Sequence, residues 1–228
     1  MFTGLIETIC TVKSVLQSAG GLLLTVDLGK LAEDCKIGDS IAINGVCLTI
    51  AGINPAINPS RAESRDGGAK HIAGFEISSE TLRISTLGKI KSGSQVNVER
   101  AMKATDRFGG HFVLGHIDGT ATIKAIKRTG QFADMVFTAR PELLSQMVVK
   151  GSVAVDGISL TIAKMDDCGF SVALIPETLK RTTLGTAKVG DVVNIETDII
   201  VKTIKKQLDK ILPQRQQLTI ERLRQLGF

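Results

Sequence analysis

The chain has 228 residues, of which 43% are hydrophobic and 4% aromatic, with neither Trp nor Tyr. This length can bury one or two ordinary cores, and no apolar run approaches the roughly 20 residues that a membrane-spanning helix needs. The formal charge of +5 lies in residues 201–228, where seven Lys or Arg face two acids, so nucleic-acid binding, which also favours aromatic stacking platforms, is not favoured.

The N-terminus lacks a basic region followed by a long apolar one, which argues against secretion. The four cysteines are Cys10, Cys35, Cys47 and Cys168, and they show no CxxC pair of the kind that zinc sites use. Four cysteines could also form disulfides, but reduced thiols in a cytosol fit this spacing better. We therefore expect a cytoplasmic protein without nucleic-acid or membrane partners.

The first elements are short strands. Residues 5–15 (LIETICTVKSV) and 22–28 (LLLTVDL) predict two strands separated by the turn signal SAGG. Residues 29–38 suit one short helix and a turn. These elements are the beginning of a β-rich unit.

A block that occurs twice follows. Residues 40–51 (SIAINGVCLTIA) and 152–163 (SVAVDGISLTIA) are identical at seven of twelve positions. Both copies alternate small or polar residues with aliphatic ones around a single glycine, as two strands joined by a tight turn would. One supersecondary unit is used twice.

A second repeated block comprises residues 79–99 and 176–196, identical at eleven of 21 positions. The spacing between copies falls from 112 to 97 residues because the first unit has 15 extra residues within 52–78, in a polar stretch with the composition of a flexible hairpin. ETLR and ETLK, each after a capping-type Ser or Pro, predict a helical turn. Each unit offers about six short strands, which predicts a small antiparallel barrel.

The tail from Ile200 has no counterpart in the first unit. Apolar residues at helical spacing predict one stripe, formed by Ile200, Ile204, Leu208, Ile211 and Leu212. Pro213 then breaks or kinks the helix, and a shorter second segment follows. The stripe could pack on its own barrel or form an oligomer contact.

Together with the opening MFTGLIE, these repeats resemble the riboflavin synthases over residues 1 to about 200. The resemblance implies an all-β fold of two tandem six-stranded Greek-key barrels, over 1–101 and 102–198, and a C-terminal α-helix in a tail over 199–228 that favours the oligomer contact. It implies a homotrimer, in which the first barrel of one subunit meets the second barrel of its neighbour, and suggests association with lumazine synthase.

The reaction that the resemblance implies is the last step of riboflavin biosynthesis. Two molecules of 6,7-dimethyl-8-ribityllumazine exchange a four-carbon unit and give riboflavin and 5-amino-6-(D-ribitylamino)uracil. The lumazine is its own electron sink, so no cofactor and no metal is expected, and the protein positions two rings and moves protons.

Differences between the repeats select the candidate catalytic residues. Thr49 matches Thr161 and Ser40 matches Ser152, which suits shared contacts to the substrate. Residues that break the symmetry are Cys47 against Ser159, Asn44 against Asp156, His116 against Leu5, and Asp198 against Ala101. From these we expect Cys47, His116, Ser159 and Asp198 to take part in the chemistry.

The family pattern also assigns binding segments. It implies that Gly4, Leu5, Ile6, Ser40, Cys47, Leu48, Thr49, Glu76, Ile77, Ser78, Ser79, Glu80 and Thr81 line a first site. It implies that Gly115, His116, Ile117, Lys150, Ser159, Leu160, Thr161, Ile175, Pro176, Glu177, Thr178, Leu179 and Lys180 line a second site. Lys150 would lie near the ribityl chain.

Each catalytic candidate has a plainer alternative. Cys47 could be a small buried strand residue, His116 a structural histidine, and Asp198 a solvated carboxylate. His116 is the only histidine that the repeats place near a site, and histidine is the residue type most often used for acid–base catalysis. His111 and His116, five residues apart in a strand-like segment, would point to opposite faces, so a two-histidine metal site is improbable.

Two other classes of protein compete. A non-catalytic lumazine or flavin antenna protein shares the tandem fold, but one of its sites typically degenerates, whereas both copies here keep their polar residues. A flavin reductase also uses a six-stranded barrel, but it needs a nucleotide domain for which this chain has no room.

Overall fold

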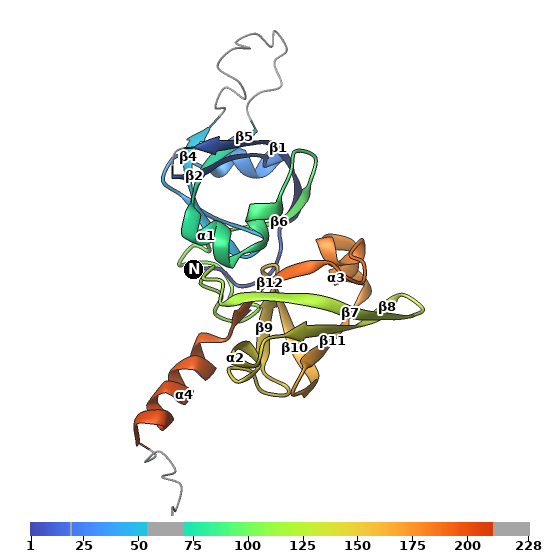
Figure 1. Cartoon of the computed structure of the whole chain (residues 1–228). Coiled ribbons are helices and arrows are strands. Elements are labelled where there is room, and N and C mark those ends of the chain that lie inside the picture. Colours follow the sequence, from blue (N-terminus) through green and yellow to red (C-terminus); the bar gives the residue numbers. More distant parts are fainter. Residues whose placement is uncertain (19, 54–70, 212–228) are drawn as a thin grey trace, which may run out of the picture.

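The computed structural model describes residues 1–18, 20–53 and 71–211, and these residues form two closed barrels and a C-terminal helix (Figure 1). In the first barrel the strands lie in the order β1-β2-β5-β4-β3-β6, and neighbours are antiparallel. Their bounds are β1 (Thr8–Ser18), β2 (Gly21–Asp27), β3 (Ser40–Ile43), β4 (Val46–Ile53), β5 (Ile72–Ser78) and β6 (Gln95–Arg100).

The second barrel repeats this topology, in the order β7-β8-β11-β10-β9-β12. Its strands are β7 (Gly119–Thr129), β8 (Phe132–Ala139), β9 (Ser152–Val155), β10 (Ile158–Asp166), β11 (Gly169–Leu174) and β12 (Val192–Thr197). The register shifts repeat as well. The shift at Val12/Ser14 matches the one at Ile123/Ala125, and the shift at Ile50/Gly52 matches the one at Ile162/Lys164. The predicted fold of two tandem six-stranded barrels with a C-terminal helix is confirmed.

Short helices close the barrels. They are η1 (Gly29–Asp34), α1 (Ser79–Ile84), η2 (Thr86–Lys89), α2 (Pro141–Leu144), α3 (Pro176–Arg181) and η3 (Thr183–Gly185). The repeated ETL triplets lie in α1 and α3, as predicted, and the cap of α1 is Ser78, whose hydroxyl accepts a hydrogen bond from the Thr81 nitrogen. The predicted hairpin excursion at 54–70 lies outside the described residues.

Alternating residues point into each barrel. On β4, Val46, Leu48 and Ile50 are buried and Thr49 is exposed, and β10 shows the same pattern with Ile158, Leu160, Ile162 and Thr161. Burying one face of each strand drives closure of the barrel, since the apolar surface leaves water. The opposite face stays available for ligands or partners.

The β3–β4 and β9–β10 turns meet between the barrels. A Cβ added to Gly45 would lie 2.6 Å from the Gly157 nitrogen, so both turns need glycine there. Buried Asn97 donates from Nδ2 to the carbonyl of Asp156 at 3.0 Å, and buried Asn194 donates likewise to Asn44 at 2.8 Å. The asparagines therefore bind each barrel to the turn of the other in a nearly two-fold arrangement.

The tail forms α4 (Ile199–Ile211), which projects from the second barrel (Figure 1). Its stripe of Ile200, Ile204, Leu208 and Ile211 is exposed, between 47% and 74%. The predicted helix is therefore present, and Leu212, Pro213 and the predicted shorter second segment lie outside the described residues. Among the described residues, no helix is long and apolar enough to cross a membrane.

Candidate functional site: two matched surfaces and a crossed pair of segments

The surface predicted for the first site is the outer face of β4 and β5. Cys47 is half-buried there and Thr49 is exposed, while Glu76 and Ser78 are exposed on β5, which pairs with β4. Ser79, Glu80 and Thr81 continue from this edge into α1. The polar residues predicted for the first site thus share one surface.

The surface predicted for the second site is the equivalent face of the second barrel. Ser159 is half-buried and Thr161 is exposed on β10, and Ile175 is exposed at the end of β11. From there α3 brings the remaining predicted residues to the same edge: Pro176, Glu177, Thr178, Leu179 and Lys180. The repeat has produced two surfaces with the same frame.

Four predicted binding residues point the other way. Leu48, Ile77 and Ile117 belong to the first hydrophobic core and Leu160 to the second. Their side chains cannot meet a ligand on the outer face, so only their backbone atoms can contribute to a site. Partly buried Leu179 also packs against the second core.

The glycine-containing segments are exchanged between the barrels, so the predicted assignment of Gly4 to the first site and Gly115 to the second is wrong. The Gly4 carbonyl accepts a hydrogen bond from the Ser159 nitrogen at 2.8 Å, and the Gly115 carbonyl accepts one from Cys47 at 2.9 Å. Ile6 packs against the second core, and Ile117 lies in the first. Each site therefore combines a surface of one barrel with a segment from the other unit.

Glycine is required at both crossings. Gly4 and Gly115 have φ of 78° and 79°, a left-handed conformation that residues with a Cβ adopt at a cost. An added Cβ would lie 2.6 Å from the Ser159 Cβ or 2.4 Å from the Cys47 Cβ. The segment that contains Gly4 therefore packs directly on Ser159, and the segment that contains Gly115 packs directly on Cys47.

His111 was not among the predicted site residues, but it lies beside Ser159, so His116 is not the only histidine near a candidate surface. Its Nδ1 lies 2.8 Å from the Ser159 Oγ, within hydrogen-bond distance. Burial lowers the pKa of His111, and the negative charge of Asp198 opposes this shift only in part. A neutral imidazole beside a hydroxyl can accept its proton.

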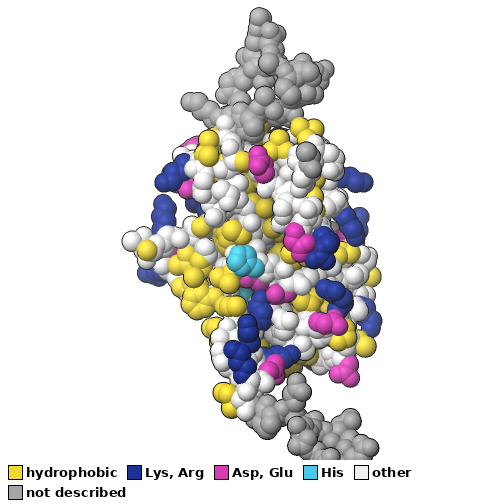
Figure 2. Space-filling view, turned by 60° about the vertical axis from the view of Figure 1, so that its left-hand side comes forward, with side chains coloured by type: hydrophobic (Ala, Val, Ile, Leu, Met, Phe, Trp, Pro, Cys, Tyr) yellow, Lys and Arg dark blue, Asp and Glu magenta, His cyan; other side chains and the backbone are white. Residues whose placement is uncertain are grey.

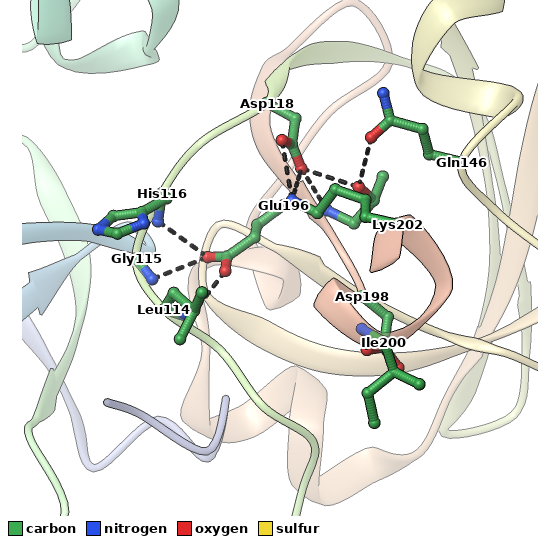
Figure 3. A network of polar contacts seen from close by, with 10 residues as sticks. Leu114, Gly115, His116, Asp118, Gln146, Glu196, Asp198, Ile200 and Lys202 are labelled. Carbon is green, nitrogen blue, oxygen red and sulfur yellow. Dashed lines mark hydrogen bonds and ion pairs between the residues drawn. The ribbon is translucent and has the colours of Figure 1, made fainter. Parts of the chain in front are cut away.

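His116 and Asp198 have different surroundings. The His116 side chain is exposed and points away from Glu196, while its backbone nitrogen donates to that carboxylate at 3.2 Å (Figure 3). Asp198 is half-buried, and its Oδ1 accepts from the Ile200 nitrogen at 2.9 Å at the start of α4. Asp198 is thus a helix-terminal residue as well as a charge near His111.

Ser40 and Lys150 lie at the margins. Ser40 is opposite Thr49 in the β3–β4 pair and lines a cleft of about 560 Å³ with Leu5 and Arg100. Lys150 is exposed, and its nitrogen donates to the Ile162 carbonyl at 2.8 Å, next to Thr161. Neither Cys47 nor Ser159 lines this cleft. Among the described residues, no group of three or more His, Cys, Asp or Glu could hold a metal ion.

Comparison with known proteins agrees with this architecture. The family model described as the lumazine binding domain matches residues 3–101 and again 114–198. Riboflavin synthase of Actinobacillus pleuropneumoniae is 39% identical, with all of both chains covered, and that of Bacillus amyloliquefaciens is 38% identical, with 92% of this chain and 91% of the relative covered.

A solved structure, LumP complexed with riboflavin, has the same fold. It superposes with a TM-score of 0.73 at 21% identity, over 86% of this chain and 99% of the other. The two matches to the lumazine binding domain, together with riboflavin synthases that are 38% and 39% identical over nearly the whole chain, show the family. The chain is a member of the riboflavin synthase family.

Proposed function

We propose that this chain is a riboflavin synthase, a transferase that dismutates 6,7-dimethyl-8-ribityllumazine. Two molecules would exchange a four-carbon unit and give riboflavin and 5-amino-6-(D-ribitylamino)uracil, the last step of riboflavin biosynthesis. The atoms of the two substrates account for both products, so the exchange needs no external oxidant or reductant.

The observation that carries this proposal is the pair of matched surfaces. Thr49 and Thr161 occupy the same exposed position, whereas the residue two places earlier is a thiol at one site and a hydroxyl at the other. A reaction between two identical molecules needs two similar sites that treat them differently. Shared residues therefore suit binding, and unshared residues suit chemistry.

Ser159 and His111 are the groups we assign to proton transfer at the second site. The acidic 7-methyl group of the lumazine must lose a proton before a carbon–carbon bond can form. The Ser159 hydroxyl, hydrogen-bonded to the neutral His111 ring, can relay that proton to Nδ1, and the nearby charge of Asp198 stabilises the imidazolium that results. Cys47 and His116 provide the corresponding groups at the first site.

One assay tests the reaction. Purified protein is incubated with the lumazine alone, and formation of riboflavin is followed by its absorbance. We expect riboflavin and the ribitylaminouracil in equal amounts, also after dialysis against a chelator. A lumazine that binds but stays unchanged would instead identify a non-catalytic antenna protein, the alternative that the tandem fold allows.

The exposed stripe on α4 supports assembly into a homotrimer. The helix projects from the second barrel (Figure 1), and apolar and basic side chains lie at its surface (Figure 2). Four apolar residues on one helix face, without a partner among the described residues, indicate an interface, because a monomer would leave this surface in water. Truncation after Asp198 should leave two folded barrels and a lighter particle. Light scattering that finds an unchanged mass would exclude α4 from the interface.

Subunit contacts would bring the first site of one chain to the second site of its neighbour. We further propose that the chain divides into a first barrel (1–101), a second barrel (102–198) and a tail (199–228) that serves assembly.

The four cysteines are free, which fits a reducing cytoplasm. Association with lumazine synthase would supply the substrate directly, and co-sedimentation of the two proteins would test it.

A further inference from the structure

Two buried carboxylates lie beneath the crossing segments. Glu99 ends the NVE motif of β6 and is 4% exposed, and Glu196 holds the same place in the NIE motif of β12 and is 2% exposed. No cation pairs with either carboxylate among the described residues. A carboxylate this deeply buried persists only where hydrogen-bond donors surround it.

The donors are backbone groups of the crossing segments. Glu196 accepts from the nitrogens of Leu114 at 2.7 Å, Gly115 at 2.9 Å and His116 at 3.2 Å (Figure 3). Glu99 accepts from the Thr3 nitrogen at 2.6 Å, the Thr3 hydroxyl at 2.7 Å and the Gly4 nitrogen at 3.0 Å. Each carboxylate therefore fixes three donors of one short segment.

The opposite edge of each segment faces the other barrel. The Gly115 nitrogen points to Glu196, while its carbonyl accepts from the Cys47 nitrogen. Gly4 repeats this between Glu99 and Ser159. Because one peptide chain spans the two groups, displacement at the carboxylate moves the segment at the site.

The segment over the first site is also held at its far end. Asp118 accepts from the Thr197 nitrogen and hydroxyl, each at 2.8 Å, and pairs with Lys202 of α4 at 2.7 Å (Figure 3). Thus Glu196 and Asp118 anchor both ends of the 114–118 segment to the second barrel, and its middle lies against the first.

We propose that Glu99 and Glu196 are positioning residues and that each acts on the site of the opposite barrel. Glu196 holds Gly115 and His116 over Cys47 at the first site, and Glu99 holds Gly4 and Leu5 over Ser159 at the second. The ligand named in the tests below rests on the proposed function, whereas the positioning itself does not.

Glutamine is the informative substitution at both positions. It keeps the size of the side chain but has one acceptor oxygen, and its NH₂ group would face a backbone N–H, so at least one of the three hydrogen bonds is lost. Burial raises the pKa of both carboxyls, and the backbone donors oppose this shift. Glu196→Gln and Glu99→Gln are matched variants, because each controls for the other.

The first experiment needs no ligand. Full-length parent, Glu196→Gln, Glu99→Gln and the surface control Glu142→Gln are treated with iodoacetamide, and alkylation of the Cys47 peptide is followed by mass spectrometry. We expect several-fold faster alkylation of Cys47 in Glu196→Gln only, since Gly115 no longer covers it. Equal rates in the Glu196 and Glu99 variants would overturn the proposal, whatever reaction the protein catalyses.

The second experiment uses double-mutant cycles on binding of the lumazine, measured by its fluorescence. Glu196→Gln should be non-additive with Thr49→Ala and additive with Thr161→Ala, and Glu99→Gln should show the reverse. Coupling within one barrel would contradict the proposal. Circular dichroism checks folding, and if Glu196→Gln does not unfold cooperatively, Glu196→Asp replaces it with the same expected pattern, because the shorter side chain withdraws the acceptor.

Discussion

The surfaces around Cys47 and Ser159 share a backbone frame but differ in the groups that can move a proton. The Ser159 hydroxyl is hydrogen-bonded to a buried imidazole, whereas Cys47 lies under Gly115, and His116, the next residue in the chain after Gly115, is exposed. The neighbouring strand differs too, with Glu76 and Ser78 at the first site.

The second site has Ala173 and Ile175 at the positions that match Glu76 and Ser78 of the first site. The first site is thus the more polar of the two, although both present a threonine at the same place. This comparison shows that the two units keep the same frame, and that differences at a few outward-facing residues give the two surfaces different chemistry. Substitutions at matched positions test this view.

The largest effect is expected at His111. His111→Ala removes the partner of the Ser159 hydroxyl and should lower the single-turnover rate at saturating lumazine by about 10²-fold or more, as loss of a general base does. His116→Ala is the matched change at the first site and should also slow the chemical step more than it weakens binding. If both variants react at the parent rate once saturated, the histidines are structural.

The next effect concerns stability and pH. Burial raises the pKa of Asp156 to about 7, although a backbone hydrogen bond from Asn194 opposes this. The folded state therefore binds a proton that the unfolded state releases near pH 4, so the stabilisation is full below that pH and is lost as the pH rises through about 7.

Asp156→Asn should raise the free energy of unfolding by on the order of 2 kcal/mol at pH 8 and change it little near pH 4. Asparagine fits this turn, because Asn44 holds the same place with φ of 45° and accepts from the Asn97 nitrogen at 2.8 Å. Urea unfolding at both pH values measures the effect. Asn44→Asp is the mirror control and should destabilise the protein at pH 8.

The sequence predicts the barrels well because their determinants are local and repeated. Period-two burial, turn glycines and the apolar stripe from Ile200 each act within a few residues, and duplication doubles the signal. The exchange of Gly4 and Gly115 was missed for a physical reason. Aligning the repeats compares equivalent positions, but it does not reveal which barrel a segment contacts.

The sequence predicted where several of the candidate residues lie. Cys47, Ser159 and the two threonines do lie on matched outer surfaces, as alternation along a strand predicts. His111 was not selected because it has no counterpart in the first unit, and its contact with Ser159 spans 48 residues. Glu99 and Glu196 did leave a signal, since an identical acidic residue follows the apolar residues of the NVE and NIE motifs and is the next to last residue of each strand.

A smaller effect should be equal at the two sites. Thr49→Ala and Thr161→Ala should each weaken binding of the lumazine by about 1 kcal/mol, the contribution of an ordinary hydrogen bond, and leave the saturated rate nearly unchanged. Fluorescence titration and single-turnover rates on the same samples separate the two quantities. A change confined to one variant would show that the threonines do not serve both substrates alike.

The smallest effect is expected at Lys150, the counterpart of Gly38. Both residues are left-handed, with φ of 69° and 94°, and both nitrogens donate to the strand that bears the site threonine, at Ile162 and Ile50. A residue with a Cβ is strained in this conformation, so Lys150 has a local cost that glycine would avoid.

Substituting Lys150 in two ways separates strain from binding. Lys150→Gly relieves the strain and Lys150→Ala keeps it, so the glycine variant should be the more stable by up to about 1 kcal/mol, less the entropy that glycine loses on folding. Both variants lack the ammonium group. We expect both to bind lumazine more weakly than the parent and to the same extent, since Lys150 donates to the residue next to Thr161. Thermal unfolding and fluorescence titration measure the two effects. Unchanged binding in both variants would remove Lys150 from the site and leave its left-handed conformation without a function.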